Sequence, residues 1–258
     1  MLSIMRYTMI TALRDFLFIG LLAVILIAIF ISVFLGSTAL TEQHQMTTAY
    51  VSGSTRFILA LGLVIFVCFH VKRLFDNKEI EFILSKPISR KSFVFSYWLA
   101  FALLSLVLAI ALSIFICLFT KPDLTGLLFW SISLICEGFL IIAFAMVSSL
   151  ILRSAVASVL STLSFYFLSR MMGFFVVAIK QPFNTNVPPL NSMIEWVSEW
   201  FLEITSMVLP RLDLFAKTKW LIYGIENQQE IVVFLLQSLI YIPLLLTMAI
   251  IDFNRKQF

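Results

Sequence analysis

The sequence predicts an all-α polytopic membrane protein with six transmembrane helices. Of the 258 residues, 61% are hydrophobic and only 12% are charged. A chain this apolar has too little polar surface to cover a water-soluble globule of its size. Its apolar residues also form runs near the length, about 20 residues, that a helix needs to cross a bilayer. We therefore expect one transmembrane domain over residues 1–258, surrounded by lipid.

Six apolar runs define the expected spans. In chain order they cover residues 16–35, 57–71, 93–119, 127–152, 155–179 and 231–251. The second run is short, so we expect flanking residues such as Arg56 to snorkel toward water. Residues 1–15 ahead of the first span fit either an amphipathic helix lying in the membrane interface or a frayed lead-in. An even number of spans returns the chain to its starting side.

Lys and Arg are unevenly shared between the two sides of this arrangement. Eleven lie on the side of the termini and six on the other side, near or between the span ends. Because cytoplasmic loops carry the excess of basic residues, we expect both termini to be cytoplasmic. The net charge of +4 follows from the same bias and requires no nucleic-acid partner.

The segment joining the second and third spans, residues 72–91, collects nine charged residues, and we call it the charged connection. Its pattern predicts a short amphipathic helix from Val71 to Leu84, ended by Pro87, with Ser89 as N-cap of the next helix. Apolar side chains such as Phe75 and Phe82 suit an anchor for a soluble partner. The pattern is also typical of an ordinary charged loop, and composition alone does not separate the two interpretations.

Two ionisable residues lie inside predicted spans. Glu137 and Arg170 are each about ten residues from the expected outer ends of the fourth and fifth spans. Antiparallel neighbours would bring them to similar depth, and an unpaired charge there is costly. We expect an intramembrane ion pair, either a structural tie or a pair that contacts substrate.

The expected outer loop, residues 180–230, contains a second amphipathic pattern. Ser192 and Glu195 fit a capping box, and Trp196 and Trp200 suit the headgroup level of the membrane. We expect an amphipathic helix on the outer surface, which would either cap a translocation path or shield the spans.

Motifs for catalysis or cofactor binding are missing from the sequence. It has two histidines, no phosphate-binding glycine loop, and three cysteines without metal-ligand spacing. We therefore expect no enzymatic activity, bound metal or cofactor in this chain.

The charged connection resembles the signature of type-2 ABC exporter permeases. That signature joins an arginine, an acidic residue and a core "LLS-x-P-x-S-R", followed directly by the third span; the stretch "FILSKPISRKSFVFSYWLA" carries it here. The matching residues are Arg73, Glu79 or Glu81, Leu84, Ser85, Pro87, Ser89 and Arg90. The stretch "LPRLDLF", residues 209–215, resembles a second motif of the same branch.

The resemblance implies a permease that moves a substrate outward across a bacterial inner membrane. ATP and magnesium would bind a separate ATPase subunit, and a second permease chain would complete a homodimer. The charged connection would be the coupling helix, with Arg73, Phe75, Glu79, Glu81, Phe82, Leu84, Pro87, Ser89 and Arg90 at the ATPase interface. The alternative is a non-transport anchoring or assembly module that docks another soluble partner.

Overall fold

The computed structural model describes residues 2–38, 42–80, 89–120, 122–180, 200, 205, 209–225 and 228–255. Every regular element in these ranges is helical. They are α1 (Leu2–Leu13), α2 (Phe16–Ser37), α3 (Gln43–Asp76), α5 (Arg90–Thr120), α6 (Leu124–Ile151), α7 (Ala155–Lys180), η1 (Leu212–Leu214), α9 (Thr218–Tyr223) and α10 (Gln228–Arg255). Six of them, α2, α3, α5, α6, α7 and α10, are long and apolar enough to cross a membrane. The chain is an all-α polytopic integral membrane protein, as the sequence predicts.

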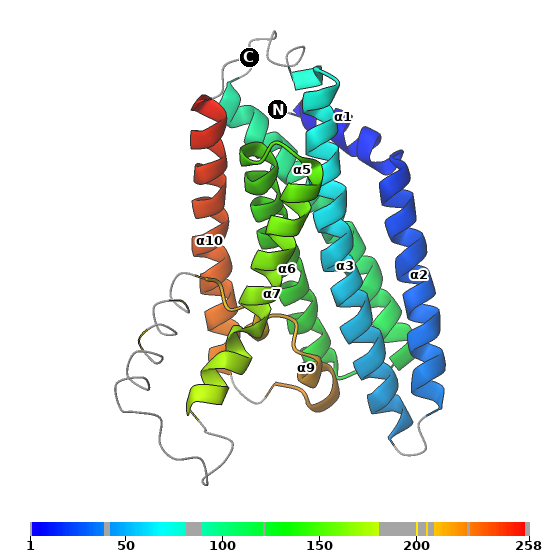
Figure 1. Ribbon diagram of the computed structural model, residues 1–258. Coiled ribbons are helices and arrows are strands. Elements are labelled where there is room, and N and C mark those ends of the chain that lie inside the picture. Colours follow the sequence, from blue (N-terminus) through cyan, green and yellow to red (C-terminus); the bar gives the residue numbers. More distant parts are fainter. Residues whose placement is uncertain are drawn as a thin grey trace.

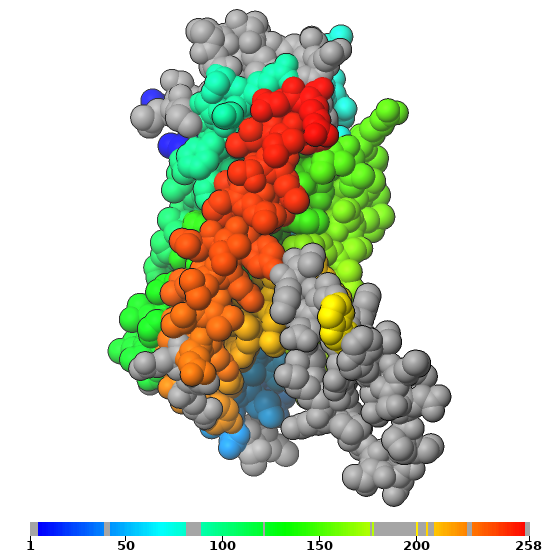
Figure 2. Space-filling view, turned by 90° about the vertical axis from the view of Figure 1, so that its left-hand side faces the viewer, coloured from blue at the N-terminus to red at the C-terminus, as the bar shows by residue number. Residues whose placement is uncertain are grey.

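Helix α6 forms the centre of the bundle. It contacts α3, α5, α7, α9 and α10, and it is the most buried of the six spans, whereas α10 is the least buried. Figure 2 shows α10 lying along one whole face of the molecule. The large apolar side chains left exposed on the outer helices provide the surface that a lipid environment requires.

Different parts of the chain meet at the two ends of the bundle. Both chain termini, the end of α3 and the start of α5 lie together at one end, which we call the terminal end (Figure 1). The end of α2, the start of α3 and α9 lie at the opposite end, which we call the distal end (Figure 1). At each end, elements that are far apart in the sequence therefore lie close together.

The second spanning helix is much longer than the predicted residues 57–71. Helix α3 runs from Gln43 to Asp76, because its polar half packs against protein instead of lipid. Thr48, Ser52 and Thr55 are buried on that half. Arg56 is only 6% exposed, so the prediction that it snorkels toward water is wrong. The other five spans begin and end within a few residues of their predicted limits.

Helix α1 is separated from α2 by a break at Arg14 and Asp15. Asp15 is the N-cap of α2, and its carboxylate accepts a hydrogen bond from the Leu17 N–H at 3.1 Å. Thr8 and Ala12 are buried on α1, which packs on α5. The residues before the first span therefore form an ordered helix of their own.

Part of the predicted outer loop is inserted into the bundle. Residues 209–217, which we call the inserted segment, include the short helix η1 and bury Leu212, Phe215 and Ala216 completely. Figure 2 shows this segment, in amber, beside the distal half of α10. The assignment of residues 180–230 to an outer loop did not include this insertion, in which apolar side chains of the segment pack against α7 and α10.

Candidate functional site

Three spanning helices bring one ionisable side chain each to a buried site in the distal half of the bundle. Arg56 comes from α3, Glu137 from α6 and Arg170 from α7, and we call them the distal cluster. The Arg56 Nε donates to Glu137 Oε2 at 2.8 Å, and its Nη2 donates to Oε1 at 3.2 Å. The Arg170 Nη1 lies 3.8 Å from Glu137 Oε1. One carboxylate is therefore shared by two guanidinium groups.

The structure brings the predicted partners Glu137 and Arg170 to ion-pair distance, but Arg56 makes the shorter, bidentate contact. The sequence interpretation missed Arg56 as a partner because it lies at the edge of an apolar run. The signal that could have found it is the spacing of Thr48, Ser52 and Thr55. These small polar residues continue one helical face up to Arg56.

Both arginines also bind backbone carbonyls of the inserted segment. The Arg56 Nη1 donates to the Ala216 carbonyl at 2.7 Å, and the Arg170 Nη1 donates to the carbonyls of Leu212 and Phe215. The N–H of Ala216 donates to Ser133 Oγ at 2.8 Å. Non-helical backbone at membrane depth must find partners inside the protein. The distal cluster therefore provides the partners that allow this segment to sit inside the bundle.

The distal cluster is largely closed to solvent. The side chains of Arg56 and Glu137 are 7% and 2% exposed, whereas that of Arg170 is 31% exposed. The Tyr166 hydroxyl lies within hydrogen-bonding reach of the same carboxylate. These polar groups are directed at one another and at the backbone, and they link α3, α6, α7 and the inserted segment.

The first residues of the charged connection belong to α3. Arg73 and Phe75 lie in its last turn, and the helix ends at Asp76 in a turn where Lys78 has φ of 56°. The predicted amphipathic helix starting at Val71 is therefore wrong at its beginning, because the spanning helix continues through it. The Arg73 Nη1 donates to Asp15 Oδ2 at 3.0 Å, which joins α3 to the α1–α2 break.

The last residues of the charged connection lead into α5. Ser89 Oγ accepts a hydrogen bond from the Ser92 N–H at 3.2 Å, which confirms its predicted role as N-cap. The Arg90 Nη1 donates to the Phe253 and Asn254 carbonyls at 3.0 and 3.2 Å. Arg90 therefore holds the start of α5 against the end of α10.

The remaining predicted site residues are less fully described. Glu79 accepts a hydrogen bond from the Asn77 amide at 3.3 Å. Glu81, Phe82, Leu84 and Pro87 lie outside the described residues, as do Ser192, Glu195 and Trp196 of the predicted outer helix. Trp200, the one of these outer residues that is described, is exposed.

No protein-family model and no curated protein matches the sequence. The described residues contain no group of three His, Cys, Asp or Glu side chains placed to hold a metal ion. Fold and site together define the chain as a six-span, all-α integral membrane protein with a buried arginine–glutamate cluster.

Proposed function

We propose that the chain is the membrane subunit of an ABC exporter of the type-2 permease class. Two copies would assemble with two ATPase subunits, which bind ATP and magnesium, and would move a substrate outward across a bacterial inner membrane. In this arrangement the terminal end faces the cytoplasm, where the basic residues concentrate. The permease chain itself performs no catalysis.

The observation that carries the proposal is how the charged connection is attached to the bundle. On one side Arg73 binds Asp15 at the α1–α2 break, and on the other side Arg90 binds the end of α10. A force applied to the connection would reach the first and last spans as well as the two that it joins. This mechanical linkage is what a subunit driven by a separate motor requires.

The sequence of the connection supports the same class. The stretch from Phe82 to Ala100 resembles the permease signature, and it leads from the connection into the third of six spanning helices. The two chain termini and the flanks of the connection share the terminal end (Figure 1). A soluble ATPase could contact all these parts from one side of the membrane.

Co-purification from native membranes tests the proposal. We expect a companion protein with the motif G-x-x-x-x-G-K-[ST], whose ATPase rate depends on the permease. Arg90→Gln should uncouple this rate while the complex stays assembled, because the hydrogen bonds from Arg90 to the end of α10 are lost. Lys91→Gln is the matched control, since it removes the same charge from the neighbouring exposed position.

The opposite result is equally definite. A stable companion without the ATP-binding motif would overturn the exporter proposal and favour an anchoring or assembly module. An ATPase rate that responds identically to Arg90→Gln and Lys91→Gln would remove the mechanical role of Arg90.

A further inference from the structure

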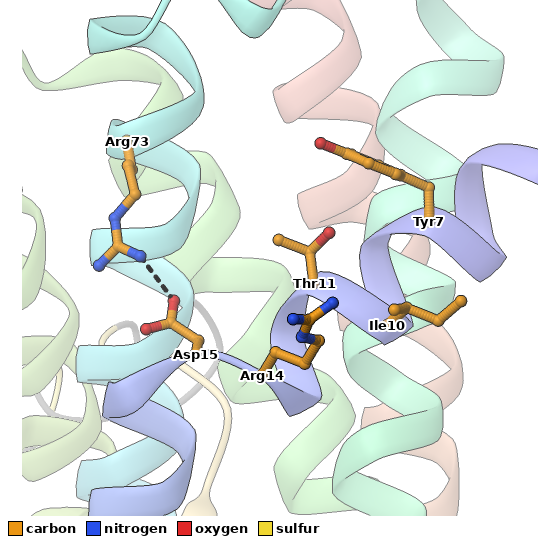
Figure 3. A pocket seen from close by; sticks show the side chains of 6 residues that line it. All are labelled: Tyr7, Ile10, Thr11, Arg14, Asp15 and Arg73. Carbon is orange, nitrogen blue, oxygen red and sulfur yellow. Dashed lines mark hydrogen bonds and ion pairs between the residues drawn. The ribbon is translucent and has the colours of Figure 1, made fainter.

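A cavity of about 400 Å³ opens at the terminal end between α1 and the last turn of α3. Its lining residues are Tyr7, Ile10, Thr11, Arg14, Asp15 and Arg73 (Figure 3). It lies at the opposite end of the bundle from the distal cluster. It shares only Arg73 with the charged connection, so the proposed coupling role does not account for it.

The cavity holds more positive than negative charge. Asp15 is the only acid among its lining residues, and the carboxylate is already occupied by the Arg73 guanidinium and by the Leu17 N–H. Arg14 is exposed, and its guanidinium has no hydrogen-bond or ion-pair partner among the residues described. One arginine of the cavity is therefore available to bind an anion.

The donors around the cavity suit a phosphate group. In Figure 3 the Tyr7 hydroxyl, Thr11 and the Arg14 guanidinium face the same space, on the side where Arg73 also lies. A guanidinium offers two parallel N–H donors that match phosphate oxygens, and hydroxyl groups add further donors. A carboxylate or phosphate could meet Arg14, but a larger set of donors favours the group with more acceptor oxygens.

The surroundings of the cavity indicate which molecule carries the phosphate. The apolar run of α2 begins at Phe16, directly after Asp15, so the cavity lies where hydrocarbon gives way to headgroups. Ile10, Leu13 and Phe16 are 48%, 49% and 84% exposed. These apolar side chains offer acyl chains a surface beside the polar cavity.

We propose that this cavity binds the phosphate of an anionic phospholipid. Arg14 supplies the charge, and Tyr7 and Thr11 supply hydroxyl donors. Basic pockets between membrane helices are recognised sites for lipid headgroups. The site concerns lipid binding only and stands independently of the proposed transport function.

Thermal unfolding of the purified full-length chain in detergent tests this site. Phosphatidylglycerol and phosphatidylcholine with the same acyl chains are titrated separately, and the midpoint shift gives an apparent affinity. We expect phosphatidylglycerol to raise the midpoint more. Arg14→Gln should weaken its binding by about tenfold, as expected for one lost charge-assisted contact.

Arg6→Gln is the matched control, because Arg6 is exposed on the same helix and does not line the cavity. It should change the affinity by less than about twofold, since a solvent-screened surface charge outside the cavity contributes little. Tyr7→Phe removes only a hydroxyl and should weaken binding by about threefold. Equal effects of Arg14→Gln and Arg6→Gln would overturn the site in favour of general surface attraction.

Inorganic phosphate distinguishes the two possible sources of the anion. We expect millimolar phosphate without lipid to produce no shift that depends on Arg14. A shift from phosphate alone that Arg14→Gln abolishes would overturn the assignment to lipid and identify a site for a soluble phosphate. Equal shifts with the two lipids would likewise overturn it.

Discussion

Each end of the bundle has an arginine paired with an acid from a different part of the chain, yet the pairs differ in their access to water. In the distal cluster, the side chains of Arg56 and Glu137 are 7% and 2% exposed. At the terminal end, Asp15 is 3% exposed but Arg73 is 51% exposed. Water can therefore replace lost contacts of Arg73, whereas the distal arginine depends on the protein alone.

This difference explains what each end can do. In the distal cluster, remaining guanidinium donors bind carbonyls of the inserted segment, so the charges build structure. At the terminal end, open space and an Arg14 without a partner among the described residues leave donors for a ligand. Burial, rather than the type of residue, separates a structural tie from a binding site.

The largest expected effect is that of Glu137→Gln. It removes the only acid of the distal cluster and leaves two guanidinium groups near each other without a counter-charge. Breaking a buried ion pair in this way costs about 3–5 kcal/mol. The free energy of unfolding in detergent measures the loss. Glu42→Gln, at an exposed acid, is the control and should cost less than about 0.5 kcal/mol.

Replacing Arg56 or Arg170 by lysine should show which of the two arginines contributes more to the free energy of unfolding. Arg56 donates three hydrogen bonds in a fixed fork that lysine cannot reproduce, so Arg56→Lys should cost about 2–3 kcal/mol. Arg170 is 31% exposed and 3.8 Å from the acid, so Arg170→Lys should cost about 1 kcal/mol. Unfolding measurements that reverse this order would show that Arg170 is the main partner.

A glycine at the distal end tests the packing beside the inserted segment. A Cβ on Gly126 would collide with the Trp220 carbonyl oxygen, so Gly126→Ala must push α9 away from α6. Such overpacking costs about 1–3 kcal/mol. Gly53→Ala is the matched control, since its Cβ would meet open space and helix propensity favours alanine by up to about 1 kcal/mol. Equal melting midpoints for the two variants would contradict the close contact.

The sequence predicts the six spans well because lipid-facing helices must be apolar along their whole length. Their class and approximate limits follow from composition and run length, as for α2 and α10. Prediction of the span limits from hydropathy fails for the first half of α3, because the buried polar face of that half contacts protein. Hydropathy measures preference for lipid, and it therefore stops at Arg56 although the helix begins at Gln43.

The candidate site is predictable only in part, for a related reason. The cost of a buried charge predicts that Glu137 needs a partner, and antiparallel geometry points to Arg170. No local pattern brings residues 209–217 back into the bundle or places the Ala216 carbonyl beside Arg56. That contact joins segments 160 residues apart, and only tertiary packing determines it.

Asp15→Asn tests the contribution of the ion pair at the terminal end. Asparagine can still cap α2, but the ion pair with Arg73 is lost. Because Arg73 is half exposed, we expect a loss below about 1 kcal/mol. Double-mutant cycles with Arg73→Gln and, at the distal end, with Glu137→Gln and Arg56→Gln compare the coupling energies directly. A terminal coupling as large as the distal one would refute the role given to burial.

The smallest expected effect is that of Asp123→Asn. Asp123 is an exposed acid at the distal end, so this variant tests whether burial or location in the bundle sets the size of an electrostatic contribution. The Thr125 hydroxyl and the Gly126 N–H donate to its carboxylate and hold its pKa below the usual value. A carboxyl group with a lowered pKa in the folded state stabilises the fold above its unfolded pKa, about 3.9, and this contribution is lost as pH falls further. The difference in unfolding free energy between the wild type and Asp123→Asn should therefore be constant above about pH 5 and narrow toward pH 3.

If exposure sets the size of these contributions, this difference should be small like that of Asp15, although Asp123 lies at the same end as the distal cluster. Thermal unfolding in detergent from pH 3 to pH 6 measures it. Asp76→Asn, at another exposed acid, controls for general acid destabilisation. A difference in unfolding free energy that stays unchanged down to pH 3 would mean that the cap does not depend on the charge of Asp123. A large difference would show that location at the distal end, rather than burial, determines the size of the contribution.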